Sequence, residues 1–251
     1  MKFTVITLFP NIISEYVNTS IISKAIKQKI IEIDIVDLRA FGKGKRRNVD
    51  DTVYGGGSGM VITVPVLDEA LNSIEISENA KIIYLSPKGK TLNQNITKQL
   101  SKECTDLILI CGHYEGIDER IFDLYPIEEI SIGDFVLTGG ELAALALIDS
   151  VTRLIPGTIK EQSWSLESFE QDLLEEAQYT KPEEYKSLKV PSVLLSGHHE
   201  NIEKYRLEDR IYTTYKKRPD LLKKYISKNK IKENYIKEIV AKKEGNQNGY
   251  N

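Results

Sequence analysis

Two glycine-bearing loops follow apolar, strand-like runs in the middle of the chain. Residues 107–111 lead into the loop 112–116 (GHYEG), and residues 127–132 lead into a loop that holds three further glycines. Glycine lets a backbone approach a ligand closely and adopt positive φ, and ligands of open α/β sheets bind at the carboxyl ends of strands. The pattern therefore predicts two walls of one pocket. Neither loop matches the G-x-G-x-x-G or Walker pattern, so an ordinary dinucleotide or phosphate-loop site is not indicated.

A third turn has the same character. Residues 81–85 form a predicted strand, and its end, Ser86-Pro87-Lys88-Gly89, combines a proline with a glycine. Because Pro87 has a fixed φ, it stiffens this turn, and the neighbouring backbone groups are available to hydrogen-bond a ligand. We expect this turn to form the third wall of the pocket.

The elements around these loops alternate between strand and helix. Strands are predicted at residues 2–9 and 31–38, and helices at 66–73, 92–100 and 141–150. Strands separated by helices of this length favour a parallel sheet covered by helices, and hence an α/β domain.

Two short helices are predicted after the first strand. Asn11 and Ser20 are candidate N-caps, because their side chains can accept a hydrogen bond from the first helical turn. The two helices are expected to end at Tyr16 and Lys29.

The loop predicted at residues 40–60 is long for a compact domain, and such loops are usually functional or disordered. It opens with four cations, Lys43, Lys45, Arg46 and Arg47, and ends in a glycine-rich stretch. Cations beside a glycine hinge are typical of phosphate contact. A solvated turn is the alternative.

The pattern changes after residue 157, where the α/β alternation ends. Residues 158–178 are polar and acidic and are predicted to form an interdomain linker. From residue 201 the apolar spacing is helical, and Pro219 suits the first position of a helix. We therefore predict an α/β domain at 1–157, a small, mostly helical domain at 179–243 and a tail at 244–251.

Charge is divided unevenly between these parts. Residues 1–178 carry 17 Lys+Arg against 27 Asp+Glu, whereas residues 179–243 carry 17 against 9. An acidic body with a basic appendage is the pattern expected of a protein that binds a polyanion. A Lys-rich helical tail without that role is the alternative.

The composition is that of an ordinary globular protein, with 41% hydrophobic and 28% charged residues. Cys104 and Cys111 show no metal-ligand spacing, and Cys111 lies in an apolar run, which favours a buried, reduced thiol. No run is long enough for a membrane span or a signal peptide, and a cytoplasmic location is expected.

Six segments resemble the bacterial tRNA (guanine-N1)-methyltransferases (TrmD family), which methylate the guanosine at tRNA position 37. They are VDDTVYGGGSGM (49–60), YLSPKG (84–89), CGHYEGIDER (111–120), SIGDFVLTGGEL (131–142), DSVTRLIPG (149–157) and VPSVLLSGHH (190–199). The resemblance spans residues 3–222 in one order. It implies the knotted α/β fold of the SPOUT superfamily, with a trefoil knot through residues 84–141, a bound S-adenosylmethionine and a homodimer.

Methyl transfer to guanine N1 makes specific chemical demands. This nitrogen carries a proton at neutral pH, and negative charge builds on O6 as the proton leaves, so the site needs a carboxylate near N1 and a cation near O6. By resemblance, Arg153 is the arginine that contacts O6. Glu167 stands where the family's catalytic base is usually an aspartate, and Glu115 is the acidic residue near cofactor and base. Glutamate is one methylene longer, but either carboxylate can accept the proton.

Each acid has an alternative interpretation. Asp172 is a nearby competitor of Glu167, which otherwise would be a solvated linker acid. Glu115 would otherwise cap a helix predicted at 117–122. His113, where the family often has arginine, is interpreted as a hydrogen-bonded loop imidazole rather than a catalytic group.

The resemblance also assigns the cofactor pocket. Phe135 stands where tyrosine is common and is expected to pack against adenine. Mg²⁺ is implied by the family, but no ligand spacing in this sequence predicts a metal site. The residues expected to bind S-adenosylmethionine are Tyr84, Leu85, Ser86, Pro87, Gly112, Tyr114, Gly116, Ser131, Ile132, Gly133, Phe135, Leu137, Gly139 and Gly140.

The resemblance predicts transfer of a methyl group to N1 of guanosine 37 in tRNA. Each phosphate contact would add a salt-dependent contribution to affinity, and an anticodon-loop target agrees with the preference of proteins for unpaired RNA bases. A knotted methyltransferase for another RNA base and a non-catalytic RNA-binding relative stay open as alternatives. The candidate phosphate contacts are Lys43, Lys45, Arg46, Arg47, Arg206, Arg210, Lys216, Lys217 and Arg218.

Overall fold

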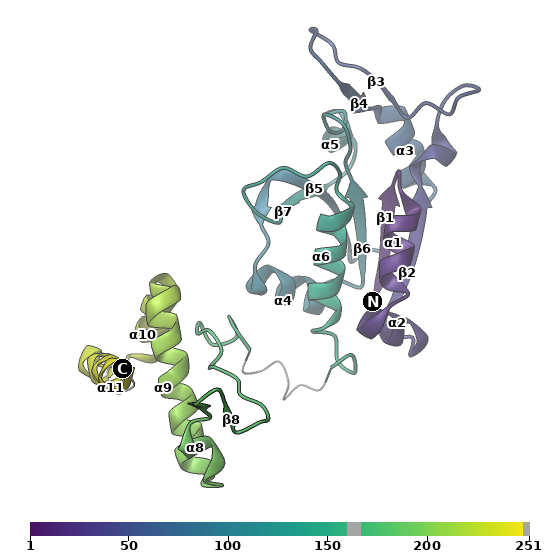
Figure 1. The fold of residues 1–251 in the computed structure, drawn as a ribbon. Coiled ribbons are helices and arrows are strands. Elements are labelled where there is room, and N and C mark those ends of the chain that lie inside the picture. The colour runs from purple at the N-terminus through teal and green to yellow at the C-terminus, as the bar shows by residue number, and fades with distance from the viewer. Residues whose placement is uncertain (160–166, 248–251) are drawn as a thin grey trace. The chain divides into compact units, whose positions relative to one another are not determined.

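A computed structural model describes residues 1–159 and 167–247. The chain divides into two compact units, Met1–Lys160 and Glu161–Asn251. Figure 1 shows the first unit in purple to teal and the second in green to yellow.

The first unit is built on a five-stranded sheet in which every neighbouring pair of strands is parallel. The strand order is β2-β1-β6-β5-β7 (Figure 1). The strands are β1 (Lys2–Thr7), β2 (Glu32–Asp37), β5 (Ala80–Thr91), β6 (Asp106–Cys111) and β7 (Ile127–Ser131). The predicted α/β class with a parallel central sheet is confirmed.

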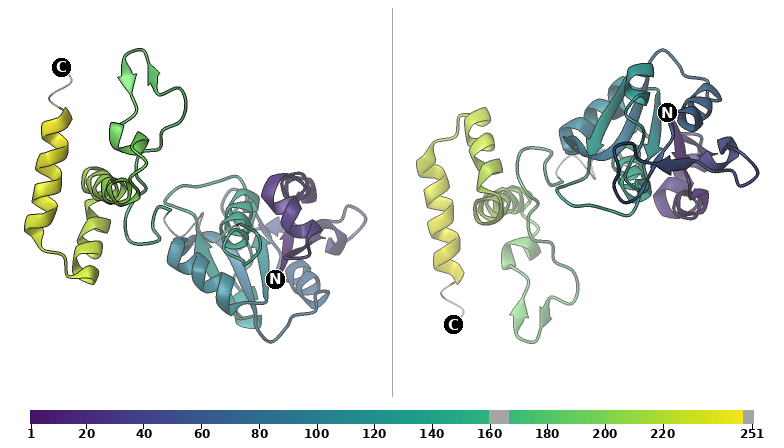
Figure 2. Two further views of the ribbon diagram at one scale, coloured as in Figure 1. Left: turned by 90° about the horizontal axis from the view of Figure 1, so that it is seen from below. Right: turned by 90° about the horizontal axis from the view of Figure 1, so that it is seen from above.

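Helices cover both faces of this sheet, which explains why β6 is apolar at every central position (Figure 1 and Figure 2). Leu107 and Leu109 pack in one core with α1 (Pro10–Val17), α2 (Ser20–Lys27), α4 (Gln94–Glu103) and α6 (Glu141–Thr152). Ile108 and Ile110 pack in the opposite core with η1 (Leu38–Phe41), α3 (Val64–Asn72) and α5 (Ile121–Leu124).

Strand β5 is much longer than the predicted strand at 81–85, and it is interrupted. Leu85 and Lys90 both register with Ile130 of β7, so the four residues between them bulge out of the ladder. The bulge is the Ser86–Gly89 turn that the sequence marks with Pro87. A turn that leaves the sheet and returns to it presents its backbone at the sheet's carboxyl edge.

Both predicted N-caps are wrong by one or two residues. Helix α1 begins at Pro10 with Phe9 as N-cap, because proline lacks the N–H that a first helical position leaves unpaired. Thr19 rather than Ser20 is the N-cap of α2. In contrast, Asn93 caps α4 by accepting hydrogen bonds from the N–H groups of Asn95 and Ile96.

The helix predicted at 117–122 is reduced to the short α5. Asp118 holds the preceding turn in place: its carboxylate accepts from the backbone N–H of Arg120 at 3.0 Å and from the guanidinium of the same residue at 2.9 and 2.6 Å. The N–H of Asp118 donates to Ile62 O at 2.9 Å. These bonds keep the chain out of helical conformation until Ile121.

The region predicted as a loop at 40–60 contains a β-hairpin. Strand β3 (Asp50–Thr52) pairs antiparallel with β4 (Met60–Ile62). Four glycines with positive φ lie between the two strands, and Gly57 at +138° has a backbone that L side chains rarely adopt. The sequence does not predict this pairing, because strands of three residues are too short to show an alternation of apolar and polar side chains.

The second unit holds a two-stranded ribbon and four helices among the described residues. The elements are β8 (Glu184–Tyr185), β9 (Leu188–Lys189), α8 (Ser192–Leu195), α9 (His199–Lys217), α10 (Pro219–Asn229) and α11 (Glu233–Gln247). Both α10 and α11 pack against α9 (Figure 2). Pro219 opens α10 as predicted, whereas α11 continues to Gln247, into the segment predicted as a tail.

Part of the predicted linker belongs to the core of this unit. Leu173 is fully buried among residues of α9, α10 and α11. The N–H of Leu174 donates to the Thr214 hydroxyl at 2.8 Å. Residues 160–166 of the predicted linker lie outside the described residues, but its second half packs on α9 instead of bridging as a spacer.

Both cysteines are free and buried, which confirms the interpretation of Cys111 as a reduced, buried thiol. Burial raises the pKa of the Cys111 thiol well above its usual range. No helix in the described part of the chain is long and apolar enough to span a bilayer.

Candidate active site

The three strand-end loops line one cavity of about 250 Å³ at the carboxyl ends of β5, β6 and β7. All fourteen predicted cofactor residues lie in its walls. His113, Ile130, Val136, Thr138 and Ala143 line it as well, and Glu115 lies at the same cavity. Val136 and Thr138 could have been predicted, since they lie between predicted residues of one loop. Ile130 and Ala143 could not, because the placement of β7 and α6 in the fold brings them to the cavity.

Two walls of the cavity are joined through their backbones. The N–H of Gly140 donates to Gly112 O at 2.9 Å, and His113 forms a β-bridge with Gly139. A Cβ at Gly140 would lie 2.8 Å from the Cα of Cys111, closer than real Cβ contacts come. Glycine at this position therefore sets the spacing between the two loops.

Tyr84 lies beneath the loop that follows β6. A Cβ at Gly112 would lie 2.6 Å from its hydroxyl oxygen, and Gly116, at φ +117°, faces the same oxygen. Burial, with smaller contributions from Glu129 and Glu119, raises the pKa of Tyr84 to about 12. The phenol therefore stays protonated and neutral across the physiological range.

Hydroxyl groups fix the other two turns. The Ser86 hydroxyl accepts from the N–H of Lys88 at 3.1 Å, inside the bulge of β5. The Ser131 hydroxyl accepts from the N–H of Gly133 at 3.1 Å and donates to the carbonyl of the same residue at 3.0 Å. Each serine thus closes the turn that follows its strand.

The rim of the cavity is apolar and exposed. Phe135 is 53% exposed and Tyr114 is 45% exposed, and Val136 and Leu137 complete the rim. Exposed apolar groups around a cavity of backbone donors and acceptors suit a ligand with a flat aromatic part and polar edges.

Glu115 faces the cavity from the loop after β6 and lies against the β3–β4 hairpin. Its N–H donates to Met60 O at 3.0 Å, and a Cβ at Gly59 would lie 2.6 Å from its Oε1. The alternative in which Glu115 caps a helix is wrong, because α5 begins at Ile121 with Arg120 as N-cap.

His113 is held by its neighbours, as the loop-imidazole interpretation expects. Its ring lies 5.1 Å from the ring of Phe9 and 4.9 Å from that of Tyr114, centroid to centroid. Its Nδ1 accepts from the N–H of Tyr114 at 3.0 Å. The imidazole thus supports the positive φ of Tyr114 in this loop.

Glu141 is a buried acid beside the cavity-lining Gly139 and Gly140, and its burial is not readable from the sequence. It is 4% exposed at the first turn of α6, and its Oε1 accepts from the Thr7 hydroxyl at 2.7 Å. A Cβ at Gly139 would collide with its carboxylate. The hydrogen bond ties β1 to the start of α6.

Removal of the Thr7 hydroxyl is expected to destabilise the fold. Thr7→Val leaves a buried carboxylate oxygen without its donor and the N–H of Phe9 without its acceptor, at a cost of about 1–3 kcal/mol in the free energy of unfolding. Urea denaturation followed by circular dichroism measures this change. Thr7→Ser keeps the hydroxyl and is the matched control. Equal stability of Thr7→Val and Thr7→Ser would contradict the role given to the bond.

The predicted catalytic residues outside the cavity lie in different units. Arg153 is half-buried and ends α6, where its N–H donates to Asp149 O at 3.1 Å. Glu167 lies in the second unit, in a turn closed by a hydrogen bond from the N–H of Glu170 at 3.2 Å. Asp172, its predicted competitor, pairs with Lys228 at 3.2 Å.

The predicted phosphate contacts fall into three groups. Lys45, Arg46, Arg47 and Lys217 are exposed and form no ion pair with other described residues. Four others pair with carboxylates: Lys43 with Glu69, Arg206 with both Glu176 and Glu203, Lys216 with Glu244, and Arg218 with Asp220. Arg210 is buried. The described residues contain no cluster of three or more His, Cys, Asp or Glu side chains that could hold a metal ion.

The sheet and its cavity define an α/β protein with a ligand site at the carboxyl edge of a parallel sheet. A model of the family "tRNA (Guanine-1)-methyltransferase TrmD" matches residues 1–224. The chain belongs to this family of methyltransferases.

Several relatives named tRNA (guanine-N(1)-)-methyltransferase are similar along most of their length. The protein of Mycoplasma capricolum is 52% identical over 222 residues, which cover 88% of this chain and 92% of the relative. That of Clostridioides difficile is 50% identical over 228 residues, with coverage of 89% and 98%. That of Malacoplasma penetrans is 51% identical over 229 residues, with coverage of 91% and 100%.

Proposed function

We propose that this protein transfers a methyl group from S-adenosylmethionine to N1 of guanosine 37 in tRNA. Family membership supports the reaction class. The observation that carries the proposal for this chain is the single cavity into which the loops after β5, β6 and β7 converge. Because tRNA is the substrate, we place the reaction in the cytoplasm.

The cavity fits S-adenosylmethionine in its chemistry. Phe135 and Leu137 offer an apolar surface for adenine, and the backbones of the three turns offer hydrogen-bond partners for polar edges. Glycines at 112 and 140, where a Cβ would collide, let the two walls come close enough to enclose a ligand. When bound, S-adenosylmethionine supplies an electrophilic methyl group on a positively charged sulfur.

The residues of the chain then position and activate the guanine. We assign the N1 proton to the carboxylate of Glu167 and the developing charge on O6 to the guanidinium of Arg153. Glu115, held against the β3–β4 hairpin, faces the cavity where the base approaches the cofactor. Holding donor and acceptor in line accounts for much of the rate, because a sulfonium is already a good leaving group.

A homodimer and a trefoil knot complete the proposal. Exposed apolar side chains lie on α1 (Ile12, 43%), α6 (Leu142, 58%) and the rim loop (Val136, 83%), and α1 packs beside α6 (Figure 1). Such a surface suits contact with a second copy. Size-exclusion chromatography with light scattering tests the dimer. The knot is proposed from family membership.

The second unit is proposed to bind tRNA, with its cations and those of the 43–47 turn on phosphates. The described residues form no protein-held site for Mg²⁺.

Methyl transfer is the decisive experiment. We expect labelled methyl from S-adenosylmethionine to appear in unmodified tRNA with guanosine at position 37, and not in the same tRNA with adenosine there. Digestion to nucleosides and mass spectrometry identifies the methylated atom. Transfer to a different base would replace the proposal by another RNA methyltransferase, and tRNA binding without transfer would favour a non-catalytic relative.

A further inference from the structure

The segment 168–178, which directly follows Glu167, is folded onto itself. The N–H of Ser168 donates to the Glu175 carboxylate at 3.1 Å, and the N–H of Glu175 donates to the Ser168 hydroxyl at 3.1 Å. Each of the two residues thus uses both its backbone and its side chain on the other. Because this pair closes a loop directly after Glu167, the place of Glu167 depends on where the loop is held.

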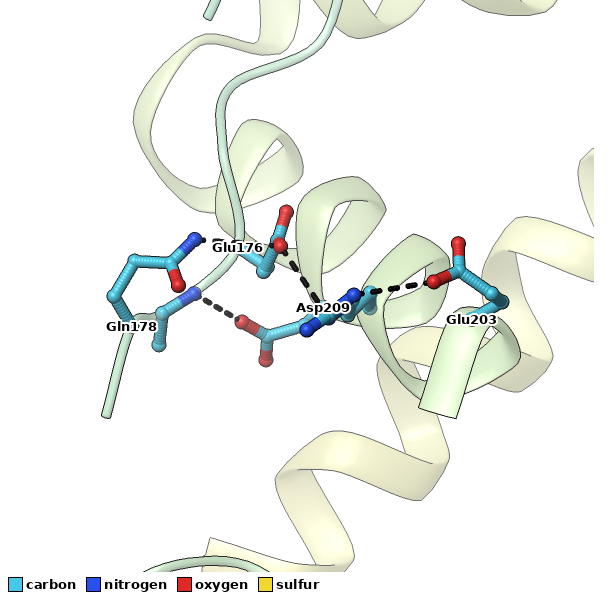
Figure 3. A network of polar contacts seen from close by, with 6 residues as sticks. Glu176, Gln178, Glu203 and Asp209 are labelled. Carbon is cyan, nitrogen blue, oxygen red and sulfur yellow. Dashed lines mark hydrogen bonds and ion pairs between the residues drawn. The ribbon is translucent and has the colours of Figure 1, made fainter. Parts of the chain in front are cut away.

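Apolar burial and hydrogen bonds hold the segment 168–178 on α9. Leu173 is fully buried among residues of α9, α10 and α11. The N–H of Leu174 donates to the Thr214 hydroxyl at 2.8 Å. The N–H of Ala177 donates to the Asp209 carboxylate at 2.8 Å, and Figure 3 shows Asp209 at this contact. The segment is therefore attached to α9 at several points along its length.

Exposed cations add weaker contacts to this attachment. Lys228 of α10 pairs with Asp172 at 3.2 Å, and the Lys228 side chain is 69% exposed. The guanidinium of Arg218 lies 5.9 Å from the centroid of the Phe169 ring, which is also partly exposed. An exposed ion pair or cation–π contact contributes at most about 1 kcal/mol. The buried contacts on α9 therefore decide where the segment lies.

Thr214 is the buried hydroxyl of this attachment. It is fully buried, and its Oγ1 donates to Arg210 O, one turn earlier in α9, at 2.7 Å. Since the proton is used on that carbonyl, the oxygen is left to accept from the N–H of Leu174. A hydroxyl bonded in both directions has a fixed orientation, so it sets the distance between α9 and the segment. Valine has the same shape but offers no acceptor.

We propose that Thr214 is a positioning residue for Glu167. It holds the segment that follows Glu167 on α9, and so fixes the carboxylate at a defined place on the second unit. The inference rests on the proposed function, because Glu167 is assigned there as the base for the guanine N1 proton. Thr214 acts on proton removal through Glu167. The base and the proposed phosphate contacts of α9 then belong to one unit.

The first arm of the test measures amide hydrogen exchange in the full-length protein without cofactor or RNA. We expect the Leu174 amide of the wild type to exchange at least about a hundredfold more slowly than in an unstructured peptide. Thr214→Val should speed this exchange by about tenfold or more. Thr213→Val, the same change at the neighbouring half-buried position of α9, should not. Exchange of wild-type Leu174 at the unstructured rate would overturn the proposal.

The second arm is a double-mutant cycle on single-turnover methyl transfer. Thr214→Val alone should lower the rate by about tenfold or more, because the base is displaced. Thr214→Ser keeps the hydroxyl and should retain most of the rate. Glu167→Gln should lower the rate by about a hundredfold or more. In the Glu167→Gln background, Thr214→Val should have no further effect, since no base is left to position.

A purely structural threonine gives a different pattern. If Thr214→Val acted through the stability of the second unit or through tRNA binding, it would lower the rate by the same factor in both backgrounds, which would contradict the proposal. We expect tRNA affinity, measured by fluorescence anisotropy, to be unchanged in Thr214→Val, and a loss that accounts for the slower transfer would contradict the proposal as well.

Failure of the proposed function has its own signature. Full activity of Glu167→Gln would refute the assignment of the base, and with it the role of Thr214 in transfer. The attachment of the segment is tested without methyl transfer, by the exchange of the Leu174 amide. The two failures are therefore separable.

Discussion

Arg153→Ala is expected to reduce single-turnover methyl transfer by about a hundred- to a thousandfold, the usual effect of removing one donor from a developing oxyanion. The affinity for S-adenosylmethionine should stay nearly unchanged, because Arg153 ends α6 and does not line the cavity. Single-turnover kinetics with labelled cofactor measure the first quantity and calorimetric titration the second. Arg153→Lys should be intermediate, since it keeps the charge but loses the planar fork.

This expectation separates a chemical role from a structural one. The N–H of Arg153 donates to Asp149 O through the backbone, so the substitution leaves that bond at the helix end in place. The unfolding transition in urea, measured on the same variant, separates any change in stability from the change in the rate of transfer. Lost cofactor affinity in Arg153→Ala would contradict the assignment to guanine O6.

The cavity could be predicted from sequence because its parts are local. Residues 107–111 are continuously apolar since helices cover both faces of the sheet, and glycine directly follows the apolar runs 107–111 and 127–132. Pro87 indicates a turn from its own fixed φ, without information from distant residues. Fourteen residues from three loops meet in one cavity because parallel strands that neighbour each other end at the same edge.

The features that were missed depend on contacts between distant residues. The return of β5 to the ladder at Lys90 is set by Ile130, and the β3–β4 hairpin is stabilised by Ile62, which bonds to the loop after β6. Glu141 is buried because its carboxylate meets Thr7 of β1. No spacing within one segment contains this information.

Arg210 shows the same limit for the predicted phosphate contacts. Charge and composition predict a solvated cation on α9, and a buried residue is found because the segment around Leu173 packs on that helix. The basic character of the second unit is readable from sequence. Which of its cations are paired, exposed or buried is decided by tertiary packing.

Gly140→Ala is expected to weaken S-adenosylmethionine binding by about tenfold or more. The added Cβ would lie 2.8 Å from the Cα of Cys111 and 3.0 Å from the N of Gly112, and both are backbone atoms that cannot rotate away. The loop after β7 must therefore move away from the loop after β6, at a strain of about 1–3 kcal/mol, which corresponds to roughly tenfold in affinity or more. Calorimetric titration of the cofactor measures the effect.

Gly245→Ala is the matched control, because it adds the same methyl group in α11 where no atom lies within 4 Å. It should leave cofactor affinity unchanged and favour the helix slightly, since alanine is the better helix former. The collision also affects the protein without cofactor. Gly140→Ala should lower its melting temperature, because the substitution strains the hydrogen bond from the N–H of residue 140 to Gly112 O. Normal cofactor binding by Gly140→Ala would show that the ligand does not lie between these loops.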